Sequence, residues 1–169
     1  MQPNGLENYY FLRMCSIDLD TALNTIKVLR RYKRLDVKYA LLRDLTVTYA
    51  RPFSTNIGRL GKHNLSVKKH VPKHFKPLHN ELVRLRMEQF AHTDMTFYNP
   101  RVIKFGPQLF AMTFKAGGYE ALLGKLPEIE ELVWLVEGSV NAQISEYEAR
   151  PDIFSDAILL TDPVGLAKI

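Results

Sequence analysis

Apolar residues recur every three or four positions along residues 129–147, and this stripe constrains the fold more than any other feature of the sequence. Pro127 suits the first position of a helix, and Arg150-Pro151 stops the pattern. The spacing predicts a long amphipathic helix that must bury one face against other helices. The residues of that face are Ile129, Leu132, Val133, Val136, Val140, Ile144 and Tyr147.

Earlier parts of the chain show the same helical period. Residues 6–29 predict either one helix or two, because Asp18 in the middle of this stretch is a plausible N-cap. A second helix is predicted from about Asp36, another candidate cap, to Arg51, and Pro52 ends it. The first half of the chain is therefore expected to be mostly helical.

The middle of the chain changes character. A further helix is predicted from about Lys76 to Ala91. After it, β-branched and aromatic residues at 101–105 and 109–115 flank Gly106-Pro107-Gln108. This pattern predicts a small β-hairpin near residues 100–115.

These elements predict a mainly α fold, a helical bundle with a small β-hairpin insertion, in a single domain over residues 1–169. Residues 27–51 carry eight Lys and Arg against two Asp, and residues 120–149 carry seven Glu against one Lys. Such faces attract one another when the helices are antiparallel neighbours. Residues 152–169 are predicted to form a short C-terminal tail.

The excess positive charge is concentrated in a predicted long basic loop, residues 53–77. Residues 59–76 contain six Lys and Arg and no acid; with these six set aside, 17 Lys and Arg remain against 18 acids, a net of −1. A concentrated basic segment attracts polyanions, so Lys68, Lys69 and Lys73 are candidate binding residues. The alternative is a solvated loop whose lysines keep the protein soluble.

The composition indicates in which cellular compartment the protein is expected. The single cysteine, Cys15, excludes an intramolecular disulfide, lies in an apolar segment, and is expected in the core of a cytoplasmic protein. The first residues do not have the pattern of a signal peptide, and no apolar run is long enough for a membrane span. Trp134 falls one place off the apolar stripe of its helix and is a candidate for a subunit contact.

Motifs for cofactors and metals are missing from the sequence. It has no Gly-rich phosphate loop and no His-Glu-x-x-His motif, so no cofactor is predicted. His70, His74 and His79 have spacings that suit a metal on a helix, but Pro72 and Pro77 interrupt any such helix. They are expected to be loop histidines, and no metal site is predicted.

The remaining candidate for chemistry is the pair Arg86 and His92, at the predicted end of the third helix. Arginine followed four to six residues later by histidine is expected about once by chance in a chain of this composition, so the spacing alone carries no weight. The setting decides between two interpretations. The pair can bind phosphate and move a proton, or His92 can bond free carbonyls at a helix end while Arg86 pairs with Glu81, Glu88 or an acid on the last helix.

The setting resembles the HEPN superfamily, small helical domains found in prokaryotic toxins and abortive-infection proteins. The matching residues are Leu78-His79, Arg86 and Ala91-His92-Thr93-Asp94, with the family's spacing. Residues 40–53 are similar to the preceding helix in members of this kind. The resemblance covers roughly residues 36–95.

The resemblance implies a metal-independent endoribonuclease of toxin or phage-defence type that acts as a homodimer, with two arginine–histidine pairs in one cleft. In that case His92 moves the proton of a ribose hydroxyl or of the leaving oxygen, and Arg86 holds the phosphate. His79 and Asp94 belong to the same motif and are candidate binding residues. The basic residues 59–76 would guide the RNA backbone.

One position departs from the family pattern. Members most often have Asn directly after the arginine, whereas this chain has Met87. Whether the protein is an enzyme therefore stays open. The alternative is a non-catalytic HEPN-like module that binds nucleic acid, a nucleotide or a protein partner, such as an antitoxin or a nucleotidyltransferase.

Overall fold

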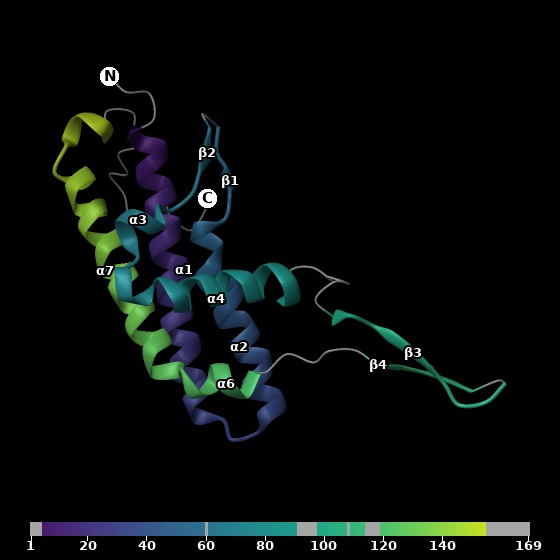
Figure 1. Ribbon diagram of the computed structural model, residues 1–169. Coiled ribbons are helices and arrows are strands. Elements are labelled where there is room, and N and C mark those ends of the chain that lie inside the picture. Colours follow the sequence, from purple (N-terminus) through teal and green to yellow (C-terminus); the bar gives the residue numbers. More distant parts are fainter. Residues whose placement is uncertain (1–4, 60, 91–97, 108, 114–118, 155–169) are drawn as a thin grey trace, which may run out of the picture.

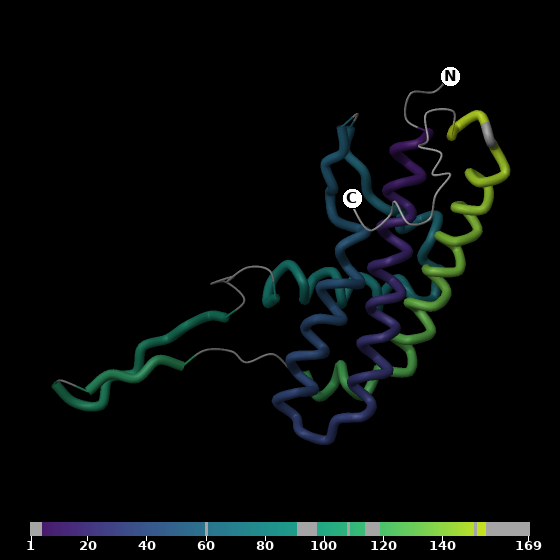
Figure 2. The backbone as a smooth tube through the Cα atoms, turned by 180° about the vertical axis from the view of Figure 1, so that it is seen from behind, coloured from purple at the N-terminus to yellow at the C-terminus, as the bar shows by residue number. Residues whose placement is uncertain are grey.

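The molecule is built around three long helices, as the computed structural model shows (Figure 1). The structure describes residues 5–59, 61–90, 98–107, 109–113 and 119–154. Helix α1 packs along both of the other long helices, and each of them runs antiparallel to it (Figures 1 and 2). The predicted mainly α bundle is confirmed. The three helices are α1 (Gly5–Arg31), α2 (Leu35–Ala50) and α7 (Leu126–Glu148).

The core lies where α1 faces its two neighbours. The apolar stripe predicted on the last helix is buried from Ile129 to Ile144, and Tyr147 is partly buried. On α1, Leu19 and Ile26 are fully buried opposite this stripe and α2. Each such side chain contributes roughly 1.5–3 kcal/mol through removal from water. Cys15 lies in the same core, where burial raises the pKa of its thiol to about 12, so it is not a nucleophile.

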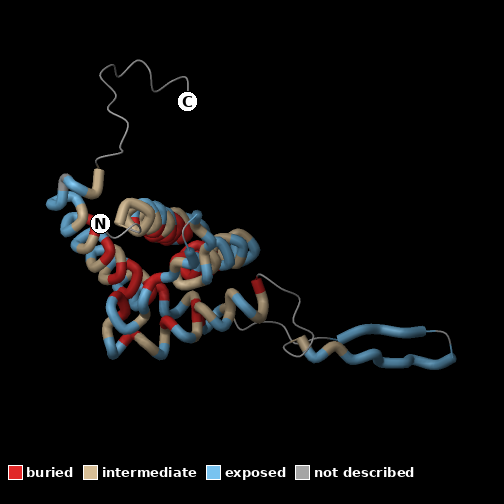
Figure 3. The backbone as a smooth tube through the Cα atoms, turned by 90° about the horizontal axis from the view of Figure 1, so that it is seen from above, coloured by how far each residue is buried: buried red, intermediate tan, exposed pale blue. Residues whose placement is uncertain are grey.

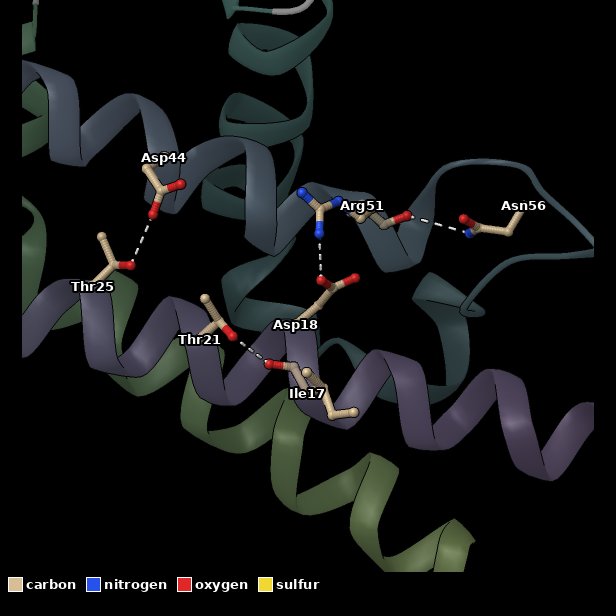
Figure 4. A network of polar contacts seen from close by, with 7 residues as sticks. All are labelled: Ile17, Asp18, Thr21, Thr25, Asp44, Arg51 and Asn56. Atoms are coloured by element: carbon tan, nitrogen blue, oxygen red, sulfur yellow. Dashed lines mark hydrogen bonds and ion pairs between the residues drawn. The ribbon is translucent and has the colours of Figure 1, made fainter. Parts of the chain in front are cut away.

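Helix α1 is continuous, and the predicted N-cap role of Asp18 is wrong. The carboxylate of Asp18 accepts a hydrogen bond from Arg51 Nη1 at 2.7 Å, across to the end of α2 (Figure 4). Burial raises the pKa of Asp18, and Arg51 acts in the opposite direction. Further along, Thr25 Oγ1 donates to Asp44 at 2.9 Å. Asp18 therefore connects two helices instead of starting one. Asp36, the other candidate cap, lies inside α2, whose N-cap residue is Arg34.

The predicted charge attraction between helix faces is confirmed at one place between α1 and α7. Arg30 makes two hydrogen bonds to the carboxylate of Glu130, with Nη1 3.0 Å from Oε1. Both side chains are partly exposed, so the pair contributes no more than about 1 kcal/mol. The burial of the apolar stripe, and not this ion pair, determines how the helices pack.

Residues 53–77 are not one long loop, as the sequence suggested, because short elements follow one another along them. Three apolar side chains, Leu65, Val71 and Phe75, are buried and fasten the segment to the bundle. Elements of two to four residues are too short to show a period in the sequence. They are η1 (Arg51–Phe53), β1 (Asn56–Ile57), β2 (Lys62–His63), α3 (Val67–His70) and η2 (Lys73–Phe75).

The turn between β1 and β2 lies tight against the start of α1. A Cβ atom on Gly58 would be 2.1 Å from Oε1 of Glu7 and 2.8 Å from Nε2 of His63, closer than real contacts allow. We therefore expect Gly58→Ala to destabilise the protein by no more than about 1 kcal/mol, since the half-buried side-chain ends of Glu7 and His63, which form an ion pair, must shift to make room. Gly61→Ala in the same turn is the matched control, because a Cβ there meets nothing within 4 Å. Equal urea midpoints for the two variants would contradict the prediction.

The predicted hairpin is confirmed, with β3 (Arg101–Lys104) antiparallel to β4 (Phe110–Thr113). Gly106 has a φ of 94°, a conformation that favours glycine, and so it turns the chain between the strands. Gln108 of the predicted turn lies outside the described residues. The hairpin extends away from the bundle (Figure 1), and the short helix α6 (Tyr119–Gly124) leads into α7.

The described part of the predicted C-terminal tail is the 3-10 helix η4 (Pro151–Phe154). The ring of Phe154 lies edge-on to that of Tyr9, with centroids 4.9 Å apart, which places this turn against the start of α1. The rest of the tail lies outside the described residues. Within the described ranges, no helix is long and apolar enough to cross a membrane.

Candidate functional site

The predicted third helix changes its winding where Arg86 begins. The α-helical part, α4, spans Lys76–Leu85, and a π-helical turn, η3 (Arg86–Phe90), follows it. The predicted helix from about Lys76 is confirmed as far as Phe90, but its last turn is π-helical, which the sequence did not predict. Single π-helical turns inside helices are frequent at functional sites. His92 and Asp94 lie outside the described residues, so the geometry of the site is that of Arg86 and its surroundings.

The π-helical turn is held from three sides. Arg43 Nη2, on α2, donates a hydrogen bond to the carbonyl oxygen of Phe90 at 3.3 Å. The hydroxyl of Tyr98 donates to the carbonyl oxygen of Gln89 at 3.2 Å. The ring of Phe90 stacks on Tyr119 from α6, with centroids 5.7 Å apart. Two of these contacts satisfy carbonyl groups that a helix end leaves free, and together the three hold the turn against α2 and α6.

Arg43, Tyr98 and Tyr119 were missed by the sequence reasoning. Arg43 contacts a residue 47 positions away, and no local pattern signals such a contact. Burial raises the pKa of Tyr119, and the nearby Tyr98 raises it further while Arg43 lowers it. Tyr119 therefore stays protonated at neutral pH and can donate a hydrogen bond beside the turn.

The guanidinium of Arg86 has no carboxylate partner within the described part of the chain. The two expected partners are used elsewhere: Glu81 accepts from Lys125 at 2.7 Å, and Glu88 accepts from Arg84 at 2.7 Å. The expected pairing of Arg86 with Glu81 or Glu88 is therefore wrong. No acid among the described residues neutralises its charge.

One nitrogen of Arg86 is also buried without a hydrogen-bond partner. Its Nε is shielded from solvent and makes no hydrogen bond to any residue that the structure describes, and its Nη1 lies 3.4 Å from the thioether sulfur of Met87. A thioether is a weak acceptor, so this contact satisfies the guanidinium poorly. Buried donors in native structures normally have partners. The arrangement fits an oxygen ligand, such as a phosphate, that would complete the set of acceptors.

His79 lies inside the molecule, and the prediction that it is a loop histidine is wrong. It is on α4 and only 3% exposed, and its Nδ1 is 2.8 Å from the hydroxyl of Tyr49 on α2. Phe53 packs edge-on against its ring, with centroids 4.5 Å apart. Burial lowers the pKa of His79 to about 4, so the ring is neutral at pH 7. These contacts make His79 a positioning residue that fastens α4, and hence Arg86, to α2.

The other two predicted loop histidines, His70 and His74, differ in how far they are buried. His70, on α3, is buried, and its Nδ1 lies 3.0 Å from the hydroxyl oxygen of Ser139 on α7. Burial lowers its pKa. His74, on η2, is exposed, and its ring lies 4.4 Å from that of Phe75. Among the residues that the structure describes, no group of three potential metal ligands occurs.

The three candidate lysines are not beside Arg86. Lys68 and Lys69 on α3 and Lys73 on η2 are exposed, but they precede the start of α4, whereas Arg86 follows its end. A ten-residue helix is about 15 Å long, and α3 lies near the start of α4, away from the end that Arg86 follows (Figure 1). A ligand that reached both would have to be extended, as a nucleic-acid strand is.

A cavity of about 1360 Å³ lies elsewhere, between the start of α1, the β1–β2 turn and the end of α7. Arg59 and His63 line it, both from the basic segment, together with Glu7 and Arg150. Its described lining includes neither Arg86 nor the candidate lysines. The sequence pointed to the charge of this segment but not to the cavity, because α1 and α7 complete its wall from distant parts of the chain.

Comparisons with known proteins give no relative from which the role of this site could be inferred. No protein-family model, no curated protein and no solved structure matches this chain. The functional conclusion therefore depends on three features: the guanidinium of Arg86, which no described carboxylate binds, the π-helical turn on which it lies, and the sequence after that turn.

Proposed function

We propose that this protein is a metal-independent ribonuclease of the HEPN-like type, acting in the cytoplasm as a homodimer in toxin or phage-defence biology. The observation that carries the proposal is the guanidinium of Arg86, which has no carboxylate partner among the described residues and holds a buried, unpartnered Nε. His92 follows six residues later in the sequence. A cation for phosphate and an imidazole for proton transfer are sufficient for RNA cleavage without a metal.

The proposed reaction is an intramolecular transfer at phosphorus. The ribose 2′-oxygen loses its proton and attacks the adjacent phosphorus, and the bond from phosphorus to the 5′-oxygen of the next nucleotide breaks. The products are a 2′,3′-cyclic phosphate and a free 5′-hydroxyl, which takes up a proton. His92 serves one of these two proton transfers, and the second copy's histidine serves the other. Arg86 binds the phosphate oxygens on which charge grows.

The structure supports this proposal through the positioning of Arg86. The contact of His79 with Tyr49 fixes α4 on α2, and Arg43 fixes the end of the π-helical turn. A site built on such fixed elements loses little free energy to ordering when the substrate binds. The direct test is cleavage of single-stranded RNA by the purified protein in EDTA, with mapping of the 2′,3′-cyclic ends.

A second candidate function is a non-catalytic module that binds nucleic acid, and Met87 is the observation that favours it. Its side chain is 50% exposed beside Arg86, and its sulfur contacts Nη1. A thioether gives phosphate no hydrogen bond, so a phosphate bound here would be held by Arg86 without help from this position. Such a site can bind a strand and leave it uncut.

For this second function, we expect the triple charge reversal Lys68→Glu, Lys69→Glu and Lys73→Glu to weaken RNA binding at least about tenfold, because each exposed lysine contributes by neutralising phosphate. Fluorescence anisotropy with a labelled oligonucleotide at several salt concentrations measures the effect, and the slope against salt should fall as well. Lys33→Glu, a change at an exposed lysine between α1 and α2, is a control for nonspecific charge effects. Unchanged affinity in the triple variant would exclude these lysines from the interface.

A further inference from the structure

Both strands of the β3–β4 hairpin are exposed (Figure 3), and large apolar side chains lie on both of its faces. On one face, Val102 lies opposite Met112, and they are 70% and 63% exposed. Phe110 lies on the same face opposite Lys104, whose ammonium is 5.8 Å from the centre of the phenyl ring. The other face carries Ile103, Phe105 and Leu109.

A hairpin with exposed apolar side chains on both faces is energetically unfavourable in water. Strands that are apolar on both faces are normally buried on both, and an isolated two-stranded hairpin is at best marginally stable. An apolar surface with six large exposed side chains exceeds the scattered exposure usual for a monomer. The composition of the hairpin is therefore explained by a partner that covers it.

The charge of the hairpin indicates the chemistry of that partner. Arg101 and Lys104 are exposed, and residues 98–113 contain no acid. Two hairpins placed side by side would bring these like charges together. The surface that fits is instead apolar or aromatic at its centre and acidic around it.

Helix α7 of the same chain carries such a surface around Trp134, which is 64% exposed. Glu131 lies one turn earlier on the same side, is exposed, and makes no ion pair with any described residue. Glu128 is exposed one turn further back. One turn after Trp134, Gly138 leaves open space in which a Cβ would meet nothing within 4 Å. This Trp134 face can receive a strand.

The neighbouring acids on α7 are occupied by the bundle itself. Glu130 is bound to Arg30 on α1. Burial raises the pKa of Glu137, and the nearby Asp20 on α1 raises it further, which places this side chain toward α1. The acids free to meet a partner at the Trp134 face are therefore Glu128 and Glu131.

We propose that the β3–β4 hairpin is a docking arm that binds the Trp134 face of α7 in a second copy of this chain. Both halves of the contact are exposed in the single chain, so one copy can offer each half to the other. A twofold arrangement forms the contact twice and doubles the buried area. The inference rests on the proposed function in assuming two copies. A dimer that persists in the arm variant refutes only the docking arm, and a dimer that docks through the arm but cleaves no RNA refutes only the enzyme.

The docking arm can be tested in the full-length protein by reversing the charges on the hairpin and on the Trp134 face. We expect wild type to be a dimer by light scattering and sedimentation at micromolar concentration. The arm variant (Arg101→Glu with Lys104→Glu) and the face variant (Glu128→Lys with Glu131→Lys) should each raise the dimer dissociation constant roughly a hundredfold, since like charges then meet. The variant with all four changes should regain the dimer. Glu146→Lys, an exposed change further along α7, is the matched control.

The protein's single tryptophan gives a second readout. Trp134 fluorescence should shift to shorter wavelength with concentration in wild type and in the four-change variant, because docking removes the indole from water. A wild type that is monomeric at 100 μM would overturn the proposal. So would an arm variant that still dimerises like wild type, or a four-change variant that stays monomeric.

Discussion

His92→Ala and Arg86→Ala should each reduce the cleavage of single-stranded RNA in EDTA by roughly 10²–10⁴-fold. Removal of His92 leaves no group to transfer the proton of the attacking or leaving oxygen. Removal of Arg86 leaves the charge that grows on the phosphate uncompensated, and it takes away the buried Nε donor. Single-turnover rates at saturating RNA separate these effects from weaker binding.

Arg84→Ala is the matched control for the loss of a positive charge on the same helix. Arg84 lies two residues before Arg86, is exposed, and pairs with Glu88 at 2.7 Å, so its loss should change the cleavage rate little. Arg86→Lys should restore part of the rate, because an ammonium supplies the charge but not the planar, bidentate geometry. If the Arg84 and Arg86 variants are equally active, Arg86 has no special role. If His92→Ala cleaves like wild type, the proposed mechanism is wrong.

Lowering the pH from 7.5 to 4.5 should cost the folded protein on the order of 2–3 kcal/mol through His79. The buried ring has a pKa of about 4, against an ordinary value of 6.5 in the unfolded chain. Between these values the unfolded state binds a proton that the folded state does not. The stability due to neutral His79 is therefore present above pH 6.5 and is lost as the pH falls toward 4.

Urea unfolding at both pH values measures this loss, and His79→Gln, which cannot titrate, should remove most of it. His70 is also buried with a lowered pKa, so it adds a loss in the same direction that both proteins share. His74→Gln, on an exposed ring, is the control for changing a histidine as such. If wild type and His79→Gln lose the same free energy, His79 is not the titrating group.

The helices could be predicted from the sequence where the signal is local and repeated. The stripe from Ile129 to Ile144 gave α7 because each turn adds another apolar residue to the same face. Asp18 shows where a local signal misleads: an acid inside an apolar pattern is typical of a cap, but its partner is Arg51, 33 residues away. The elements of residues 53–77 are only two to four residues long, which is too short to show a period in the sequence.

The candidate site could be predicted in part. The sequence located Arg86 near a helix end, but not the π-helical turn or its support by Arg43, which depend on the packing of α2. That Glu81 is bound to Lys125, 44 residues away, could not be predicted from spacing either. The burial of His79 did have a signal, because Phe75, His79 and Leu82 share one helical face and all three are buried.

Because α1 packs between α2 and α7, the core has to form in stages while the protein is being synthesised. As the chain leaves the ribosome, α1 and α2 can associate at once, since only three residues separate them. The other side of α1 has to wait until α7, about a hundred residues later, has been synthesised. During that interval its apolar surface is open to chaperones and to other nascent chains. The core of this protein is therefore completed late, by a contact between distant parts of the sequence.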